Sequence, residues 1–291
     1  MTPDLRVVVV GPGRVGGSLA AALSTAAMGV ELRGRPGAPP PDVGARSPLA
    51  GASGPPAPGE PIPATLIFAV PDDALEGAAR AWADALAGNG AVSETVDPPR
   101  VALHTSGVHG PELLAPLRDL GWAVGGWHPL TAVGTVDAGA FRGRAVGLAG
   151  DPAAVDRGEE LARSVGARPL YVDDGAHARY HAAAVLASNG LVACLAAARE
   201  ELAASTGGAG DLADLLPLAR AALDHVADRG LDGGLTGPVD RGDAGTVRRD
   251  MAALGPDRAD LYRRLARELL DVAGERLPPE RRRALRELLA D

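Results

Sequence analysis

The feature that most constrains the fold is a short apolar run followed directly by a glycine-rich turn. Residues 5–10 read LRVVVV, and this run of mostly β-branched residues predicts a buried parallel strand. Glycines at positions 11, 13 and 16 follow at once and open an alanine- and leucine-rich helical pattern. A strand, a tight glycine turn and a helix in this order are typical of a dinucleotide-binding turn, although a glycine turn without a ligand is the alternative. The residues expected to bind the dinucleotide here are Gly11, Gly13, Arg14, Val15 and Gly16.

Strand and helix patterns continue to alternate up to residue 173. Further strands are predicted over a series of apolar runs: 29–33, 65–70, 100–104, 122–128, 144–150 and 168–172. Between Pro36 and Pro63, however, 15 of 28 residues are Pro or Gly, which predicts a loop where a Rossmann domain has a helix and its third strand. We therefore expect one of these two elements to be degenerate.

After Asp174 the pattern becomes entirely helical. The stretch AHARYHAAAVLASNGLVACLAAAREELAAS predicts one helix of about thirty residues, apolar nearly all round at its centre, and three further helical patterns follow. The predicted fold is therefore an α/β Rossmann domain with a parallel sheet, residues 1–173, followed by an all-α domain, residues 174–291. A helix that is apolar on every face needs more cover than one small domain supplies, so we expect a homodimer formed through the helical domain.

The end of the second strand indicates which dinucleotide binds. A site for NAD usually has an acidic residue there to hold the ribose hydroxyls, but Glu31 lies within the predicted strand. Arg33 and Arg35 occupy the end instead, and a guanidinium binds phosphate through two donors. These arginines favour NADP, with its 2′-phosphate, over NAD.

Polar residues gather where other predicted strands end. In an open parallel sheet, ligands collect beyond the carboxyl ends of the strands. The residues expected to contact the cofactor there are Val70, Pro71, His104, Thr105 and Ser106. Ser106, His128 and His181 are candidates for a proton donor, and structural hydrogen bonding in loops is the alternative for the histidines at strand ends.

The long predicted helix also carries polar residues. His177 and His181 are four residues apart and can share one helix face, but no third ligand has suitable spacing, so no metal site is expected. Ser188 and Asn189 lie within a strongly apolar stretch, where a buried amide needs partners. Either they bond across helices or they face the site, and Asn189 is therefore a catalytic candidate.

Composition and charge exclude several classes of protein. The formal net charge is -8 with no basic face, which argues against nucleic-acid binding. All 29 basic residues are arginine, so Schiff-base chemistry and a phosphate-loop lysine are excluded. Cys194 is the single cysteine, which fits a reducing cytoplasm. No apolar run reaches ~18 residues and a strand pattern begins within five residues of the start, so we expect neither a membrane span nor a signal peptide.

Six motifs in order give a resemblance to a known family: VVVVGPGRVGGSLA, FAVPDDAL, LHTSG, WHPL, YHAAAVLASNGLVA and LTGPVDRGDAGTV. Together they resemble the Rossmann-like and DUF2520 domain-containing proteins. More distantly, the layout is similar to pyrroline-5-carboxylate reductase and the 6-phosphogluconate dehydrogenase-like superfamily. Members of the β-hydroxyacid dehydrogenase branch use a catalytic lysine, which this chain lacks, so that mechanism does not carry over.

The resemblance implies a nicotinamide-dependent reductase or dehydrogenase and brings no established substrate. With Arg33 and Arg35 favouring NADP over NAD, the main hypothesis is an NADP-dependent oxidoreductase that acts on a small imine or keto substrate, which can be anionic. The resemblance also implies that the loop TGPVDRGDAGTV, residues 236–247, approaches the cleft, where Arg241 would hold an anionic group beside Asp243. An internal Arg241–Asp243 salt bridge is the alternative. A second hypothesis is a non-catalytic dinucleotide-binding sensor or interaction protein that keeps the fold.

Overall fold

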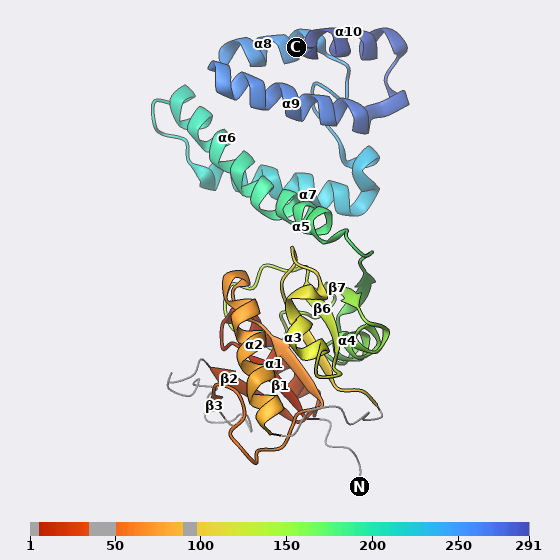
Figure 1. Ribbon diagram of the computed structural model, residues 1–291. Helices are drawn as coiled ribbons and strands as arrows, with labels where there is room; N and C mark the ends of the chain where they lie inside the picture. Colours follow the sequence, from red (N-terminus) through yellow and green to blue (C-terminus); the bar gives the residue numbers. More distant parts are fainter. Residues whose placement is uncertain (1–5, 35–50, 90–97, 291) are drawn as a thin grey trace. The chain divides into compact units, whose positions relative to one another are not determined.

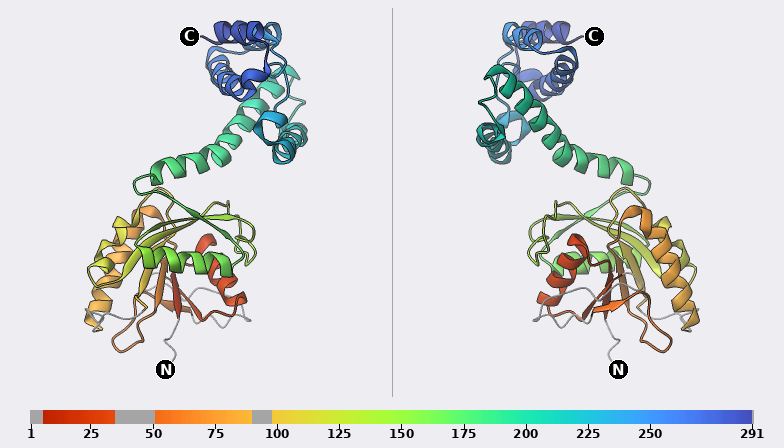
Figure 2. Two further views of the ribbon diagram at one scale, coloured as in Figure 1. Left: turned by 90° about the vertical axis from the view of Figure 1, so that its right-hand side faces the viewer. Right: turned by 90° about the vertical axis from the view of Figure 1, so that its left-hand side faces the viewer.

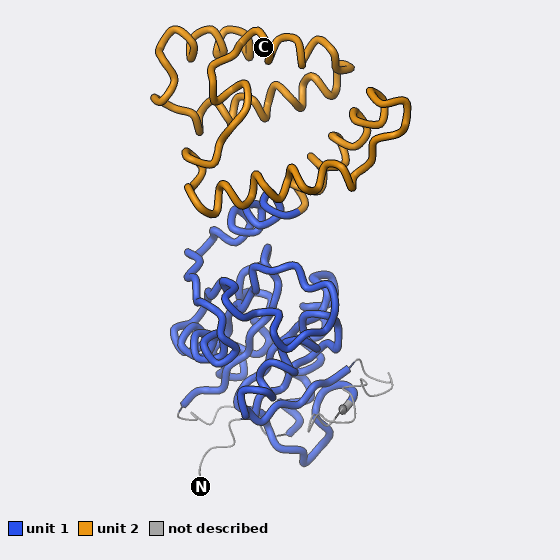
Figure 3. The backbone as a smooth tube through the Cα atoms, turned by 180° about the vertical axis from the view of Figure 1, so that it is seen from behind, with its two compact units in different colours: residues 1–188 blue, residues 189–291 orange. Residues whose placement is uncertain are grey.

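The computed structural model describes residues 6–34, 51–89 and 98–290, and its strands, with helices between several of them, extend up to Tyr171 (Figure 1). Only helices follow from His177 onward. The chain forms two compact units, residues 1–188 and 189–291 (Figure 3). The first long helical segment therefore begins in the first unit, after the last strand.

Eight strands of the described residues form one sheet in the order β3-β2-β1-β4-β5-β6-β7-β8. Their bounds are β1 Val7–Val10, β2 Val30–Gly34, β3 Gly51–Ser53, β4 Thr65–Phe68, β5 Val101–His104, β6 Ala123–Pro129, β7 Ala145–Gly150 and β8 Arg168–Tyr171. The chain runs outward from β1 to β3 and then returns to β4 on the other side of β1. The crevice between β1 and β4 is thus a topological switch point, where open α/β sheets bind ligands.

Two details of the sheet differ from the sequence prediction. β7 pairs antiparallel with β6, because no helix of the described chain crosses between them, so the sheet is mixed and not wholly parallel. β3 lies within the Pro- and Gly-rich stretch that predicts a loop, and it adds three residues beside β2. All other described pairings are parallel.

Helices cover both faces of this sheet (Figure 2). α1 (Arg14–Thr25) and α4 (Pro152–Ser164) pack on one face, and α2 (Asp72–Gly88), η1 (Pro111–Leu114) and α3 (Ala115–Arg118) pack on the other. Successive side chains of a strand point to opposite faces. Val7 and Val9 of β1 therefore enter the core with α1, whereas Val8 and Val10 enter the core with α2.

The helices after the sheet have the bounds α5 His177–Val185, η2 Leu186–Gly190, α6 Leu191–Ser205, α7 Leu212–Gly234, α8 Ala244–Ala253, α9 Pro256–Ala273, η3 Gly274–Arg276 and α10 Pro279–Leu289. α5, η2 and α6 form one continuous helical segment, as the sequence predicts, with a π-helical turn at η2. α8, α9 and α10 share a small core that includes Val247, Leu270 and Leu285. The predicted loop 236–247 is shorter than expected, because Asp243 caps α8 and its last four residues are helical.

The segment His177–Ser205 has little cover in a single chain. Leu186 is 73% exposed and Val192 is 66% exposed. In the part of the chain that the structure describes, this is the one helix long and apolar enough to cross a membrane by length and composition, and only 6% of its most apolar window is buried. Its apolar residues do not form an uninterrupted run, and for this reason the sequence did not predict a span here.

The hydrophobic core with α1 and α4 allows a prediction of how a cavity changes the stability of the first unit. Leu103 in β5 is fully buried in the core with α1 and α4, so Leu103→Ala is expected to lower the free energy of unfolding by about 2–5 kcal/mol. Trp82, Trp122 and Trp127 are the chain's three tryptophans, and all lie in this unit, so their fluorescence during denaturant unfolding reports the change. Val136→Ala, at a position 57% exposed, is the control and is expected to stay within about 0.5 kcal/mol of the wild type. Equal effects of the two substitutions would contradict the assignment of this core.

Candidate functional site

The turn between β1 and α1 requires glycine at two positions. Gly11 has φ +107°, and a Cβ there would contact the carbonyl group of Ala69 and lie 3.1 Å from Cγ1 of Val70. A Cβ on Gly16 would meet the carbonyl oxygen of Gly11. Gly13 precedes α1, and among the described residues no side chain caps the N-terminus of this helix. Its first N–H groups are therefore available to an anion.

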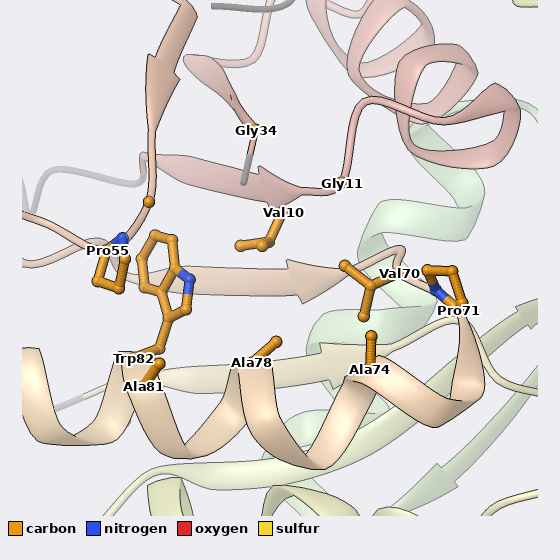
Figure 4. Close-up of a pocket in the computed structure, with 11 residues that line it drawn as sticks. Val10, Gly11, Gly34, Pro55, Val70, Pro71, Ala74, Ala78, Ala81 and Trp82 are labelled. Atoms are coloured by element: carbon orange, nitrogen blue, oxygen red, sulfur yellow. The ribbon is translucent and has the colours of Figure 1, made fainter. Parts of the chain in front are cut away.

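A pocket of about 220 Å³ adjoins this turn (Figure 4). Gly11, Val70 and Pro71, three of the predicted cofactor residues, lie at one end, and Trp82 and Pro55 lie at the other. The remaining lining residues are Val10, Gly34, Gly54, Ala74, Ala78 and Ala81. A narrow apolar pocket with one large aromatic side chain suits a flat heterocycle such as adenine.

Arg33 lies beside this pocket, but its guanidinium is engaged within the protein. Nε donates to Glu31 at 2.6 Å, and Nη2 donates to Glu60 at 2.8 Å. Nη1 donates to the carbonyl oxygen of Gly54 at 3.3 Å, and the guanidinium lies 5.8 Å from the centre of the Trp82 ring. Arg35, the second arginine predicted to bind phosphate, lies outside the described residues.

The histidine at the end of β5 is deeply buried. His104 Nε2 lies 3.0 Å from the carbonyl oxygen of Gly110, so this ring ties the strand to the following loop. Burial lowers the pKa of His104, and Nδ1 has no hydrogen-bond partner among the described residues. Ser106 is also buried and accepts a hydrogen bond from the His109 N–H at 3.3 Å. Thr105 donates its backbone N–H to Phe68 at 3.0 Å. The strand-end motif HTSG thus shapes this loop through its polar groups.

His128 of β6 and His181 of α5 approach each other at Gly107. A Cβ on Gly107 would lie 2.7 Å from Nε2 of His128 and 2.8 Å from Nδ1 of His181, so only glycine allows both rings at this point. The ring centroids of His128 and His181 are 6.0 Å apart. His181 Nδ1 is buried and has no hydrogen-bond partner within the described chain. The structure therefore brings these two predicted proton donors together beyond the ends of β5 and β6.

Tyr180 is a member of this cluster that sequence analysis missed. Its hydroxyl lies 3.0 Å from Nδ1 of His128 and 3.3 Å from the His128 carbonyl oxygen. This contact holds the ring so that Nε2 faces Gly107. Burial raises the pKa of Tyr180 to about 12, so its hydroxyl keeps its proton at neutral pH.

The electrostatics of the cluster keep His128 neutral. Burial, and next the neighbouring His181, lower the pKa of His128 to about 4. Asp72 at the start of α2 opposes this shift, and His104 adds to it. Asp72 directly follows Pro71, a lining residue of the pocket, so the histidine cluster and the pocket share the N-terminus of α2. No three His, Cys, Asp or Glu side chains of residues 6–34, 51–89 and 98–290 form a metal-binding group.

The remaining predicted site residues belong to the second unit. Asn189 lies in the π-helical turn η2, where the Ser188 hydroxyl donates to the Ala184 carbonyl at 2.7 Å. Asp243 accepts from the Thr246 N–H at 3.0 Å and from the Thr246 hydroxyl at 2.7 Å, which makes it the cap of α8. These hydrogen bonds lower the pKa of Asp243. Arg241 is exposed on the second unit, and its role toward an anionic substrate stays a prediction.

The sequence contains only weak indications of the pocket-lining residues of α2 and of Tyr180. Ala74, Ala78, Ala81 and Trp82 recur at helical spacing along α2, and small residues at such positions leave space between helix and strand. Tyr180 directly precedes His181, yet only the packing of α5 over Gly147 shows that its hydroxyl contacts His128.

Comparison with known proteins confirms the family resemblance. Residues 145–269 match the family model described as "Domain of unknown function (DUF2520)". The match extends from β7 to α9 and so includes the last two strands of the sheet. Residues 145–269 are thus similar to this family, and a Rossmann-type strand order precedes and overlaps them. No curated protein sequence matches the chain.

Solved structures share the fold over nearly the whole chain. Protein TM1727 from Thermotoga maritima is 19% identical with a TM-score of 0.67, over 93% of this chain and 99% of that one. A "putative NADP oxidoreductase BF3122" from Bacteroides fragilis is 19% identical with a TM-score of 0.68, over 92% and 98%. A reductive aminase from Aspergillus terreus, in complex with NADPH and ethyl levulinate, is 15% identical with a TM-score of 0.54, over 98% and 92%. These structures share the fold of this chain, a Rossmann-type domain followed by helices.

The lowered pKa of His128 makes stability depend on pH. An unfolded histidine binds a proton near pH 6.5, whereas folded His128 does so near pH 4, so acid favours the unfolded chain between these values. Stability contributed by neutral His128 is complete above pH 6.5 and falls by about 2 kcal/mol between pH 7 and pH 5. Tryptophan-monitored unfolding of the wild type and His128→Gln at both pH values measures it. Equal losses in the two proteins would contradict the buried, neutral state of His128.

Proposed function

We propose that the protein is an NADP-dependent oxidoreductase that reduces or oxidises a small keto or imine compound. The observation that carries this proposal is the pocket at the β1–β4 switch point, which runs from the Gly11 turn to Trp82. When bound there, the nicotinamide cofactor supplies the hydride chemistry. The protein's own contribution is to bind the cofactor and substrate and to hold a proton near them.

The residues present fit a dinucleotide. Open space beside Gly13, where a Cβ would meet nothing within 4 Å, and the uncapped N-terminus of α1 leave backbone N–H groups for a pyrophosphate. The apolar end beside Trp82 and Pro55 accommodates the adenine. His128, His181 and Ser106 are the proposed proton donors, with Tyr180 holding His128 in place. Because His128 is neutral, it would act through its Nε2 side, which faces Gly107.

A substrate-panel assay tests this function. Purified protein with NADPH is offered 2-keto acids and cyclic imines, and the absorbance of NADPH is followed. Turnover that is lost in His128→Gln and retained in His225→Gln, an exposed position on α7, supports the proposal. NADPH binding with no turnover of any compound would favour the non-catalytic sensor, the second candidate function.

We propose a preference for NADPH over NADH through Arg35, which follows Gly34 of the pocket directly in sequence. Losing a guanidinium–phosphate contact costs about 1.5–3 kcal/mol. Calorimetry is therefore expected to show that Arg35→Ala weakens NADPH binding by roughly ten- to a hundredfold and leaves NADH binding unchanged. Equal wild-type affinities for the two cofactors would refute the preference.

We also propose that the exposed apolar helix is covered by a second copy of the chain and not by a membrane. α6 has only Ala197 buried among its described residues, although it is rich in Ala and Leu. A stable soluble helix of this composition needs an apolar partner. Charged residues Arg199, Glu200 and Glu201 follow within the same helix, which suits a protein interface better than a bilayer.

Light scattering at micromolar concentration is expected to give twice the chain mass of 29.3 kDa. Val192→Arg, on the exposed face of α6, is expected to shift the protein toward monomer, because it places a charge in the apolar contact. Val136→Arg, an exposed position in the first unit, is the control and is expected to leave the mass unchanged. A monomeric wild type, or sedimentation of the protein with phosphatidylcholine vesicles, would overturn the dimer.

A further inference from the structure

We infer that Arg33 and Glu60 are positioning residues of the adenosine pocket. Arg33 holds the pocket wall, the loop with Gly54 and Pro55, and Glu60 holds Arg33 in place. Arg33 is therefore not a ligand of the cofactor phosphate. The inference rests on the proposed function, because it concerns how the same pocket receives a dinucleotide. It assigns roles to Arg33 and Glu60 that differ from the phosphate-binding role expected of an arginine at the end of this strand.

Three of the five N–H donors of the Arg33 guanidinium are engaged within the protein. Each of its three nitrogens donates to a different partner, namely Glu31, Glu60 and the carbonyl of Gly54. The side chain is only 5% exposed, whereas that of Glu60 is 40% exposed. A phosphate would have to displace Glu60, the more accessible of the two carboxylates.

The contacts of Arg33 lead to the pocket wall. Gly54, whose carbonyl it binds, lines the pocket together with Pro55, and Trp82 faces Pro55 there (Figure 4). The same loop is fixed from its other side by Asn89, whose side chain donates to the Ala57 carbonyl at 3.0 Å. Arg33 and Asn89 thus hold the two sides of the loop that closes the adenosine end.

The charges around Arg33 also argue against phosphate binding by its guanidinium. Arg6 also pairs with Glu31, at 3.2 Å, so Arg6 and Arg33 face two carboxylates and the cluster carries no net charge. The hydrogen bond from Arg33 lowers the pKa of Glu60, which keeps this carboxylate ionised at neutral pH. A second anion would therefore be repelled by Glu60 and not attracted to a free guanidinium.

The Glu60→Ala substitution distinguishes a positioning role of Arg33 from a phosphate-binding role, because the two roles predict different changes in ligand affinity. Calorimetry is run with NADH, NADPH and 5′-AMP. If Glu60 holds Arg33 and the pocket wall in place, Glu60→Ala binds all three ligands more weakly by a similar factor. The factor is roughly fivefold, which is the scale of one lost hydrogen bond. If Arg33 is a phosphate ligand, removing Glu60 frees the guanidinium, and NADPH binding strengthens relative to NADH; that result would overturn the inference.

Two further variants complete the test. Glu76→Ala breaks an exposed Glu76–Arg80 pair on α2, the helix that carries Trp82, and is expected to leave all three affinities unchanged. Arg33→Ala is expected to weaken all three ligands alike, and a loss confined to NADPH would refute the positioning role. If Arg33→Ala does not fold, Glu60→Gln replaces it, with the same direction expected. A wild type that binds neither NADH nor NADPH overturns the proposed function itself, which is a different result from a changed NADPH-to-NADH ratio.

Discussion

The close approach of the Gly11 backbone to the carbonyl group of Ala69 is the constraint on which the rest of the first unit depends. It brings the turn after β1 against the end of β4 at the point where the strand order reverses. A side chain at Gly11 would separate these strands and close the pocket between them. The same contact places Val70 and Pro71 at the pocket mouth, and through them the start of α2 next to the histidine cluster. Backbone packing thus links the glycine turn, the pocket and the start of α2.

The histidine cluster illustrates a site in which burial determines the chemistry. His128 and Tyr180 are both held in their neutral forms, because neither charge is solvated there. The neutral imidazole of His128 contacts the Tyr180 hydroxyl through Nδ1 and faces Gly107 through Nε2. Such a ring can hold a proton without attracting an anion. Any binding of an anionic substrate group then depends on a residue outside this cluster, and the sequence predicts Arg241 for that role.

Much of this arrangement could be predicted from the sequence. Strands with continuous apolar runs, such as 65–70, and the glycine turn are local patterns, and the structure confirms the Rossmann-type domain followed by helices. The antiparallel β7 could not be predicted, because strand direction depends on the path of the connection and not on residue type. Arg33 shows the same limit: its position at a strand end suggested a phosphate, whereas its partners Glu60 and Gly54 come from a distant loop that sequence spacing does not place.

The π-helical turn at Leu186–Gly190 has a consequence for the whole segment from His177 to Ser205. A turn closed by i→i+5 bonds contains one residue more than an α-helical turn, and each helical residue advances about 100° around the axis. The side chains after this turn are therefore offset around the axis from where an uninterrupted helix would put them. Tyr180 and His181 before this turn and the apolar side chains beyond residue 190 therefore follow two different helical registers. Deleting a single residue between 186 and 190 is expected to restore a regular helix and bring the two segments into one register, so the extra residue sets the offset between them.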